Sequence, residues 1–221
     1  MPLRKAKVAS SPIVTPPSTS DPLFSSVGLL CPFRESFVDR STYARSLSSQ
    51  GVSMSADTAK FGSQSAKFGS QTFLSFGNGG DLTLAADFLI EAWVFQTARP
   101  TEFSPILECL NGTGYSFGLR NGRVNFYDYS MDHTGNTVIP LNEWHHIAAW
   151  RRNGILSFWI DGVPDFAREN TRNITASGNF RIGSNSWSFV PTFWFTGYLQ
   201  DLRLTKASRS PILPTQPFPT S

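Results

Sequence analysis

Two Asn-Gly pairs, Asn121-Gly122 and Asn153-Gly154, each lie between short segments in which apolar and polar residues alternate. A two-residue hairpin turn needs positive φ angles, and Asn-Gly adopts them at low cost. The sequence therefore predicts two β-hairpins, in "YSFGLRNGRVNFYDY" and in "WHHIAAWRRNGILSFWIDG".

Further strands follow from the same period of two residues. The segment "DFLIEAWVF" places Phe88, Ile90, Ala92 and Val94 on one face. The segment "FTGYLQDLRLTK" is expected to form a last strand with a one-residue bulge near Gln200 or Asp201, because its leucines change phase there. No segment shows a sustained helical period of apolar residues, so an all-β chain is expected.

The five letters KFGSQ occur twice, seven residues apart, within residues 59–76. The period stops after two copies, which excludes a repeat array. Because seven is odd, Phe61 and Phe68 would face opposite sides of one continuous strand. We therefore expect two short strands, one at Lys60 and Phe61 and one over residues 66–76.

Composition narrows the class of protein. The chain has 221 residues with 19 Phe and 6 Trp, and many short strands with turn signals between them favour a two-sheet antiparallel jelly-roll sandwich. No apolar run is long enough to span a membrane.

The net charge is +3 with scattered basic residues, which argues against nucleic acid as a partner. Cys31 and Cys109 are expected to be buried thiols.

Three regions are expected along the chain. Residues 1–22 read as an extended arm rich in Pro, Ser and Thr, because they carry too few apolar side chains to fold alone. Residues 23–207 are expected to form the sandwich, and residues 208–221 a proline-rich tail. The basic N-terminus lacks the apolar run of a signal peptide.

The order of these segments resembles the concanavalin A-like, laminin-G-like jelly roll. The resemblance covers about residues 23–215 and is carried by "SAKFGSQTFLSF", "DFLIEAWVF", "EWHHIAAWRRNGILSFWIDGV", "FRIGS" and "FTGYLQDLRLTKASR". It implies a core of packed aromatic side chains between the sheets, here Trp93, Trp144, Phe158 and Phe195. The closing "GYLQDLRLTK" with "PTQPFP" is similar to versions found in bacteriophage particle proteins.

Enzymatic activity is not expected. Some relatives of this fold are glycoside hydrolases with an E-x-D-x-x-E pattern, whose two carboxylates work as a pair. No Glu of this chain is followed by Asp two residues later, and Glu91 precedes Ala-Trp-Val. The nucleophile elbow G-x-S-x-G is also absent.

No cofactor is expected, although calcium is the metal usual in this fold class. Calcium needs several converging oxygen ligands. The candidates are Asp128, Asp132 and Asn136 in one loop, with Asp81 and Asp87 elsewhere. The alternative is that they are ordinary turn residues. His133, in the same loop, is expected to be solvated.

Aromatic side chains offer a candidate glycan site, because lectin-like sandwiches can hold a sugar against an exposed ring. The loop "SNSWSFVPTFWF" contributes Trp187, Phe189 and Trp194, and a neighbouring hairpin contributes Tyr127 and Tyr129. The alternative is that these rings fill the sandwich or contact another subunit.

Two hypotheses of function follow. The first is a non-enzymatic structural protein of a phage virion, assembled in the host cytoplasm. It would be a capsid decoration protein or a tail or baseplate component, with other virion subunits as partners and a homo-oligomeric state. The arm would dock it through Arg4, Lys5, Pro12, Ile13, Val14, Pro16 and Pro17, since a stiff proline-rich segment loses little entropy on docking. The alternative is a carbohydrate-binding adhesin that recognises host surface glycans.

Overall fold

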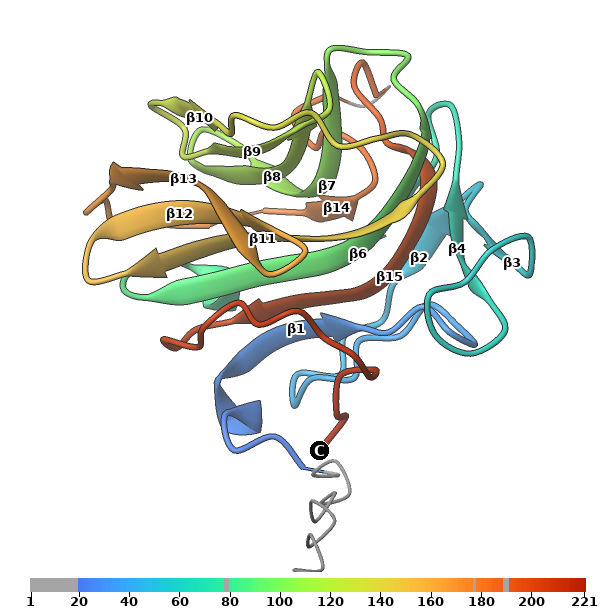
Figure 1. Cartoon of the computed structure of the whole chain (residues 1–221), viewed down its shortest axis with the longest axis horizontal. Helices are drawn as coiled ribbons and strands as arrows, with labels where there is room; N and C mark the ends of the chain where they lie inside the picture. The colour runs from blue at the N-terminus through green and yellow to red at the C-terminus, as the bar shows by residue number, and fades with distance from the viewer. Residues whose placement is uncertain (1–19, 78–79, 177, 189–190) are drawn as a thin grey trace, which may run out of the picture.

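Two antiparallel sheets stack face to face in the computed structural model (Figure 1), which describes residues 20–77, 80–176, 178–188 and 191–221. The larger sheet contains β1 (Val27–Cys31), β3 (Ser53–Ser55), β4 (Ser65–Phe68), β6 (Phe88–Ala98), β11 (Trp144–Arg152), β12 (Ile155–Ile160), β13 (Val163–Glu169) and β15 (Thr196–Thr205). The smaller sheet contains β2 (Ser48–Gln50), β5 (Phe73–Phe76), β7 (Phe103–Leu110), β8 (Gly114–Arg120), β9 (Arg123–Tyr127), β10 (Asp132–Thr134) and β14 (Phe180–Ile182). The fold class predicted from the sequence is confirmed.

Strand order in the larger sheet is β13-β12-β11-β6-β15-β4-β3, and β1 and β4 pair with different parts of β15. The smaller sheet runs β10-β9-β8-β7-β14-β5-β2. Two short 3-10 helices, η1 (Phe24–Ser26) and η2 (Gly80–Leu82), interrupt this pattern. Within the described residues, none of the helices has the length and apolarity needed to cross a membrane.

Both predicted hairpin turns are confirmed. Asn121 and Gly122 have φ angles of 48° and 77° between β8 and β9, and Asn153 and Gly154 have 49° and 76° between β11 and β12. The expected bulge lies in β15, where the register with β6 shifts between Gln200 and Arg203. The bulge restores the inward direction of the later leucines, and both Leu202 and Leu204 are buried in the core.

The core lies between the two sheets and is rich in phenylalanine. It takes Phe88, Ile90, Ala92 and Val94 from β6, as their alternation predicts. Burying each large apolar side chain is worth about 1.5–3 kcal/mol. Cys31 and Cys109 are free and buried, as expected.

The two KFGSQ copies lie in unlike surroundings. The strand expected at Lys60 and Phe61 is wrong, because these residues lie outside the strands. The amides of Lys60 and Phe61 donate to Oε1 of Gln200, at 2.6 and 3.0 Å, and the Phe61 ring packs edge-on against Trp93. The second copy begins in β4, where Phe68 enters the core. The strand expected over residues 66–76 is broken by a turn, because β4 and β5 belong to different sheets.

Trp93 and Trp144 do not pack between the sheets, in contrast to Phe158 and Phe195. Trp93 follows the polar phase of β6 and lies against Phe61 and His146. Trp144 contacts Phe95, with ring centroids 5.6 Å apart. Aromatic packing therefore extends over the outer face of the larger sheet.

The segment after β15 folds back over β1 and ends beside Asp21 (Figure 1), whose amide donates to Ser221 O at 2.9 Å. Phe218 is 4% exposed and packs in a small cluster with Val27 and Leu30. The guanidinium groups of Arg203 and Arg209 lie 5.2 and 5.9 Å from its ring. These contacts attach the proline-rich segment to the sandwich.

Candidate functional site

The candidate site lies on the outer face of the smaller sheet. Along β7, β8 and β9 the residues Leu107, Phe117 and Phe126 point into the core. Because side chains alternate, the intervening Glu108, Ser116, Asn125 and Tyr127 belong to the outer face.

The described parts of the loop between β14 and β15, residues 183–188 and 191–195, cover part of this face. The loop begins where β14 ends, at Gly183, whose φ is 90° and whose added Cβ would lie 2.3 Å from the Phe68 ring. Any other residue at position 183 is therefore disfavoured, both by the positive φ angle and by the clash with the Phe68 ring. The loop returns to the same point, because the Phe195 amide donates to Gly183 O at 2.9 Å.

Asn185 organises the loop from within and is fully buried. Its Oδ1 accepts the amides of Thr192 and Phe193, each at 2.8 Å. Arg181 of β14 donates to the carbonyls of Asn185 and Ser188, both at 2.8 Å. These bonds hold the segment that presents Trp187.

Glu108 fixes the loop to the sheet. Its Oε1 accepts the Ser186 amide at 2.6 Å and its Oε2 accepts the Ser116 hydroxyl at 2.6 Å. The Ser186 hydroxyl in turn accepts the Leu110 amide at 2.8 Å. Burial raises the pKa of Glu108 to about 7, and the bonds from Ser116 and Ser186 only partly oppose this.

A hollow of about 180 Å³ lies between this loop and the sheet. Trp187 forms part of its wall and is 56% exposed, whereas the Tyr127 side chain on the sheet is half-buried. Phe103 and Phe193 also line the hollow and contact each other edge-on, with ring centroids 6.2 Å apart. The hollow thus combines aromatic surface with polar groups.

Charges in the hollow are compensated locally. Arg120 pairs with Asp132 at 2.8 Å and with Glu102 at 3.2 Å. The amide nitrogen of Asn125 donates to Asp132, the His133 carbonyl and the Thr134 hydroxyl. The lining therefore offers hydrogen-bonding groups, and its one arginine is paired with carboxylates.

The structure brings together two of the five aromatic residues selected from the sequence, Trp187 and Tyr127. Tyr129 is 46% exposed and lies beside Tyr127, whose hydroxyl donates to its carbonyl at 3.1 Å. Trp194 is half-buried and pairs through its backbone with Ser184. Phe189 lies outside the described residues.

Other candidates also fall outside the described residues. They are the arm residues Arg4, Lys5, Pro12, Ile13, Val14, Pro16 and Pro17. Sequence reasoning missed Glu108, Asn125 and Arg120 of the hollow. The alternation of β7, β8 and β9 is the signal that would have placed them on the outer face.

The calcium candidates do not converge. Asp132 is paired with Arg120, Asn136 bonds to Asp165, Asp81 pairs with Arg45, and the Asp87 carboxylate accepts the Asn153 amide. No group of three or more acidic, His or Cys side chains suited to a metal occurs in the part of the chain that the structure describes.

Asp128 instead closes its own turn. Burial would raise its pKa, but hydrogen bonds from Ser130 and Met131 outweigh this and hold the pKa at about 2. Asn170 donates to its other oxygen at 2.8 Å. The expectation that His133 is solvated is wrong: it is 2% exposed, because β10 places it opposite Phe126, which faces the core.

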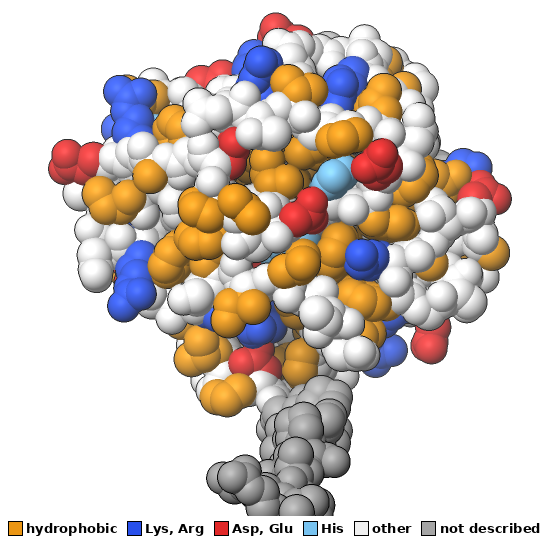
Figure 2. Space-filling view, in the orientation of Figure 1, with side chains coloured by type: hydrophobic (Ala, Val, Ile, Leu, Met, Phe, Trp, Pro, Cys, Tyr) orange, Lys and Arg blue, Asp and Glu red, His pale blue; other side chains and the backbone are white. Residues whose placement is uncertain are grey.

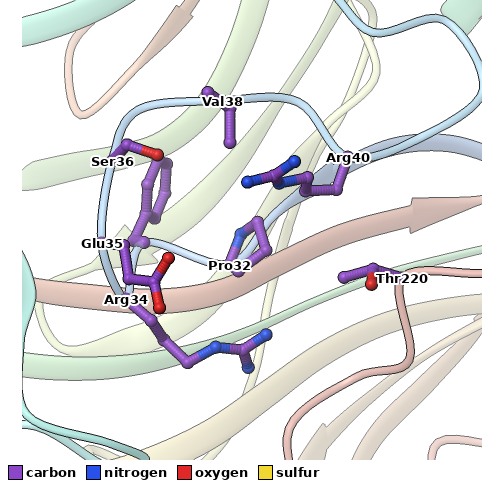
Figure 3. Close-up of a pocket in the computed structure, with 8 residues that line it drawn as sticks. Pro32, Arg34, Glu35, Ser36, Val38, Arg40 and Thr220 are labelled. Atoms are coloured by element: carbon purple, nitrogen blue, oxygen red, sulfur yellow. The ribbon is translucent and has the colours of Figure 1, made fainter. Parts of the chain in front are cut away.

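A different hollow lies between the loop after β1 and the C-terminal segment (Figure 3). It measures about 180 Å³ and is lined by Arg34, Arg40 and Thr220, among others. Figure 3 shows the Arg40 guanidinium pointing into it. Its aromatic neighbour Phe33 is fully buried, so this hollow offers no exposed ring.

A family model supports the sandwich assignment. The description "Concanavalin A-like lectin/glucanases superfamily" matches residues 68–211, more than half of the chain. The chain belongs to this superfamily. The comparison with curated proteins gives no match.

Solved structures show the same fold. One is domain 4 of AbnA, an extracellular GH43 arabinanase from Geobacillus stearothermophilus, in complex with arabinotriose: 18% identity, a TM-score of 0.63, and coverage of 81% of this chain and 92% of that one. Another is the binding domain of botulinum neurotoxin serotype D: 11% identity, a TM-score of 0.66, and coverage of 86% and 50%.

A third similar structure belongs to botulinum neurotoxin type C, whose cell entry depends on two ganglioside molecules: 14% identity, a TM-score of 0.63, and coverage of 84% and 49%. The chain thus spans about half of these neurotoxin chains. At such identities the likeness concerns the fold alone. Two of these similar structures are associated with glycans by their descriptions, the arabinanase domain with arabinotriose and neurotoxin type C with gangliosides.

Proposed function

We propose that this concanavalin A-like chain is a carbohydrate-binding domain and that a sugar occupies the hollow beside Trp187. The observation that carries the proposal is an indole more than half exposed at a hollow that is lined by both aromatic and polar side chains. A sugar ring has an apolar face of C–H groups and a rim of hydroxyls. The apolar face packs against an exposed aromatic ring, and the hydroxyls need side-chain hydrogen-bond donors and acceptors.

The loop that carries Trp187 is suited to this role because it is held in advance. Asn185, Arg181 and Glu108 fix its backbone through hydrogen bonds. A loop whose backbone is ordered before binding loses less entropy when the ligand binds. The glycan-binding domains among the structural neighbours support the same function.

We propose binding without hydrolysis. Glu108 is 1% exposed, and each of its oxygens already accepts a hydrogen bond. Asp132 is paired with Arg120. Neither carboxylate of the hollow is arranged as a free partner for the acid and nucleophile roles that glycoside cleavage requires.

Glycan-array binding followed by titration calorimetry tests the proposal, comparing Trp187→Ala with the wild type. Loss of a central aromatic contact is expected to cost about 2 kcal/mol or more, roughly thirty-fold in affinity. Tyr43→Ala is the matched control, since Tyr43 is 44% exposed and lines none of the hollows described above. Equal binding by wild type and Trp187→Ala would refute the proposed site.

A further inference from the structure

A second hollow lies next to the first and also has Trp187 in its lining. It measures about 270 Å³ and shares Leu110 and Trp187 with the first. Its remaining lining consists of polar residues, namely Asn111, Asn179, Arg181, Ser186 and Ser188. Trp187 and Leu110 therefore belong to the lining of both hollows, which makes the two hollows neighbours.

Neither hollow alone reaches the 300–1,000 Å³ that is typical of small-molecule sites, whereas the two together do. Their shared wall is an exposed indole above the end of β7. A ligand that is longer than one ring can contact Trp187 at its middle and place its ends on both sides.

The wall between the hollows is firmly held. Ser186, which precedes Trp187, accepts the Leu110 amide and donates its own amide to Glu108. Ser188, which follows it, has its carbonyl bonded to Arg181. The backbone on both sides of Trp187 is therefore held in place, which supports the wall that the two hollows share.

The charged side chains that line the two hollows together are two arginines and two acids, Arg120 and Arg181 with Asp132 and Glu108, and this balance favours an uncharged ligand. In the first, Arg120 is compensated by Asp132 and Glu102. In the second, the charge of Arg181 is opposed by that of the nearby Glu108. The Arg181 guanidinium also donates to two loop carbonyls and lies 4.2 Å from the centre of the Phe73 ring. Hydroxyl and amide side chains supply the remaining contacts, which suits sugar hydroxyls rather than a carboxylate.

We infer that the two hollows form one groove for a linear, neutral oligosaccharide of at least three sugar units, with the central unit against Trp187. The inference rests on the proposed function and adds the length and the charge of the ligand. It distinguishes this chain's site from one built for sialylated glycans.

The experiment uses the full chain and a panel of linear neutral oligosaccharides of one to five units from the arabinose, xylose, mannose and glucose series, with sialyllactose as the charged comparison. Calorimetry on the best-binding series is expected to show at least a ten-fold gain in affinity from one unit to three. Sialyllactose is expected to bind at least ten-fold more weakly than the best trisaccharide.

Asn179→Ala isolates the second hollow, because Asn179 is exposed and lines only that side. We expect it to weaken trisaccharide binding about five-fold or more and to leave monosaccharide binding and the melting temperature unchanged. If affinity is independent of length, if sialyllactose binds best, or if Asn179→Ala has no effect, the groove is refuted while the proposed function stands. If no member of the panel binds, both fall together.

Discussion

Glu108→Gln tests how the Trp187 loop is attached to the sheet. Gln has the same shape, and its oxygen and nitrogen can serve the Ser186 amide and the Ser116 hydroxyl in the same positions. The substitution therefore keeps the attachment and removes the titration. The pKa of Glu108 is about 7 in the folded chain, against 4.5 for an ordinary Glu.

The direction in which the free energy of unfolding changes with pH follows from proton binding at Glu108. Between pH 4.5 and 7 the folded chain holds a proton on Glu108 that the unfolded chain has lost, so the free energy of unfolding falls as the pH rises. The difference of about 2.5 pKa units corresponds to about 3 kcal/mol across this window. The contribution is fully present below pH 4.5 and is lost as the pH passes 7.

Urea denaturation of wild type and Glu108→Gln from pH 4.5 to 8 measures this contribution. The stability of the variant relative to the wild type is expected to rise by up to about 3 kcal/mol over this range. Asp201, whose pKa burial also raises to about 7, is present in both proteins, so its effect cancels in the difference. A difference that stays constant with pH would refute the account of Glu108 as a buried titrating attachment.

Three further outcomes are expected. Phe218→Ala should lower the free energy of unfolding by about 3–5 kcal/mol in urea denaturation, because its ring is buried against the sandwich; a loss below about 1 kcal/mol would contradict the docked tail. Gly183→Ala should destabilise more than Gly62→Ala in thermal unfolding, since both have positive φ but only Gly183 faces a ring at 2.3 Å; equal shifts in melting temperature would contradict this. Asn185→Ala should lower the affinity for the glycan, as measured by calorimetry, because two loop amides lose their acceptor. An unchanged affinity would contradict the view that an ordered loop supports binding.

The hairpins and the bulge were predictable from sequence because their causes are local. Asn-Gly pairs define a turn without reference to the rest of the chain, and the phase change near Gln200 can be read along one strand. The alternation of β6 likewise fixed which of its side chains enter the core. These features need only neighbours along the chain.

Features that depend on distant segments were not predictable. The alternation of β6 separates Trp93 from the core-facing residues of that strand, but its partners Phe61 and His146 come from other parts of the chain. The burial of His133 depends on its partner strand. Glu108 became part of the site only because the loop after β14 folds back over β7. The phage-particle hypothesis relied on the arm, of which residues 1–19 lie outside the described residues, and it stays a prediction.

Figure 2 shows charges of both signs interspersed with apolar side chains on the face in view. The most direct measurement of the central claim is a crystal structure of the chain with the best-binding neutral trisaccharide. A sugar ring packed against the Trp187 indole, with further units in the hollows on both sides, is the predicted result. A trisaccharide bound away from Trp187, such as in the arginine-lined hollow of Figure 3, would contradict the account.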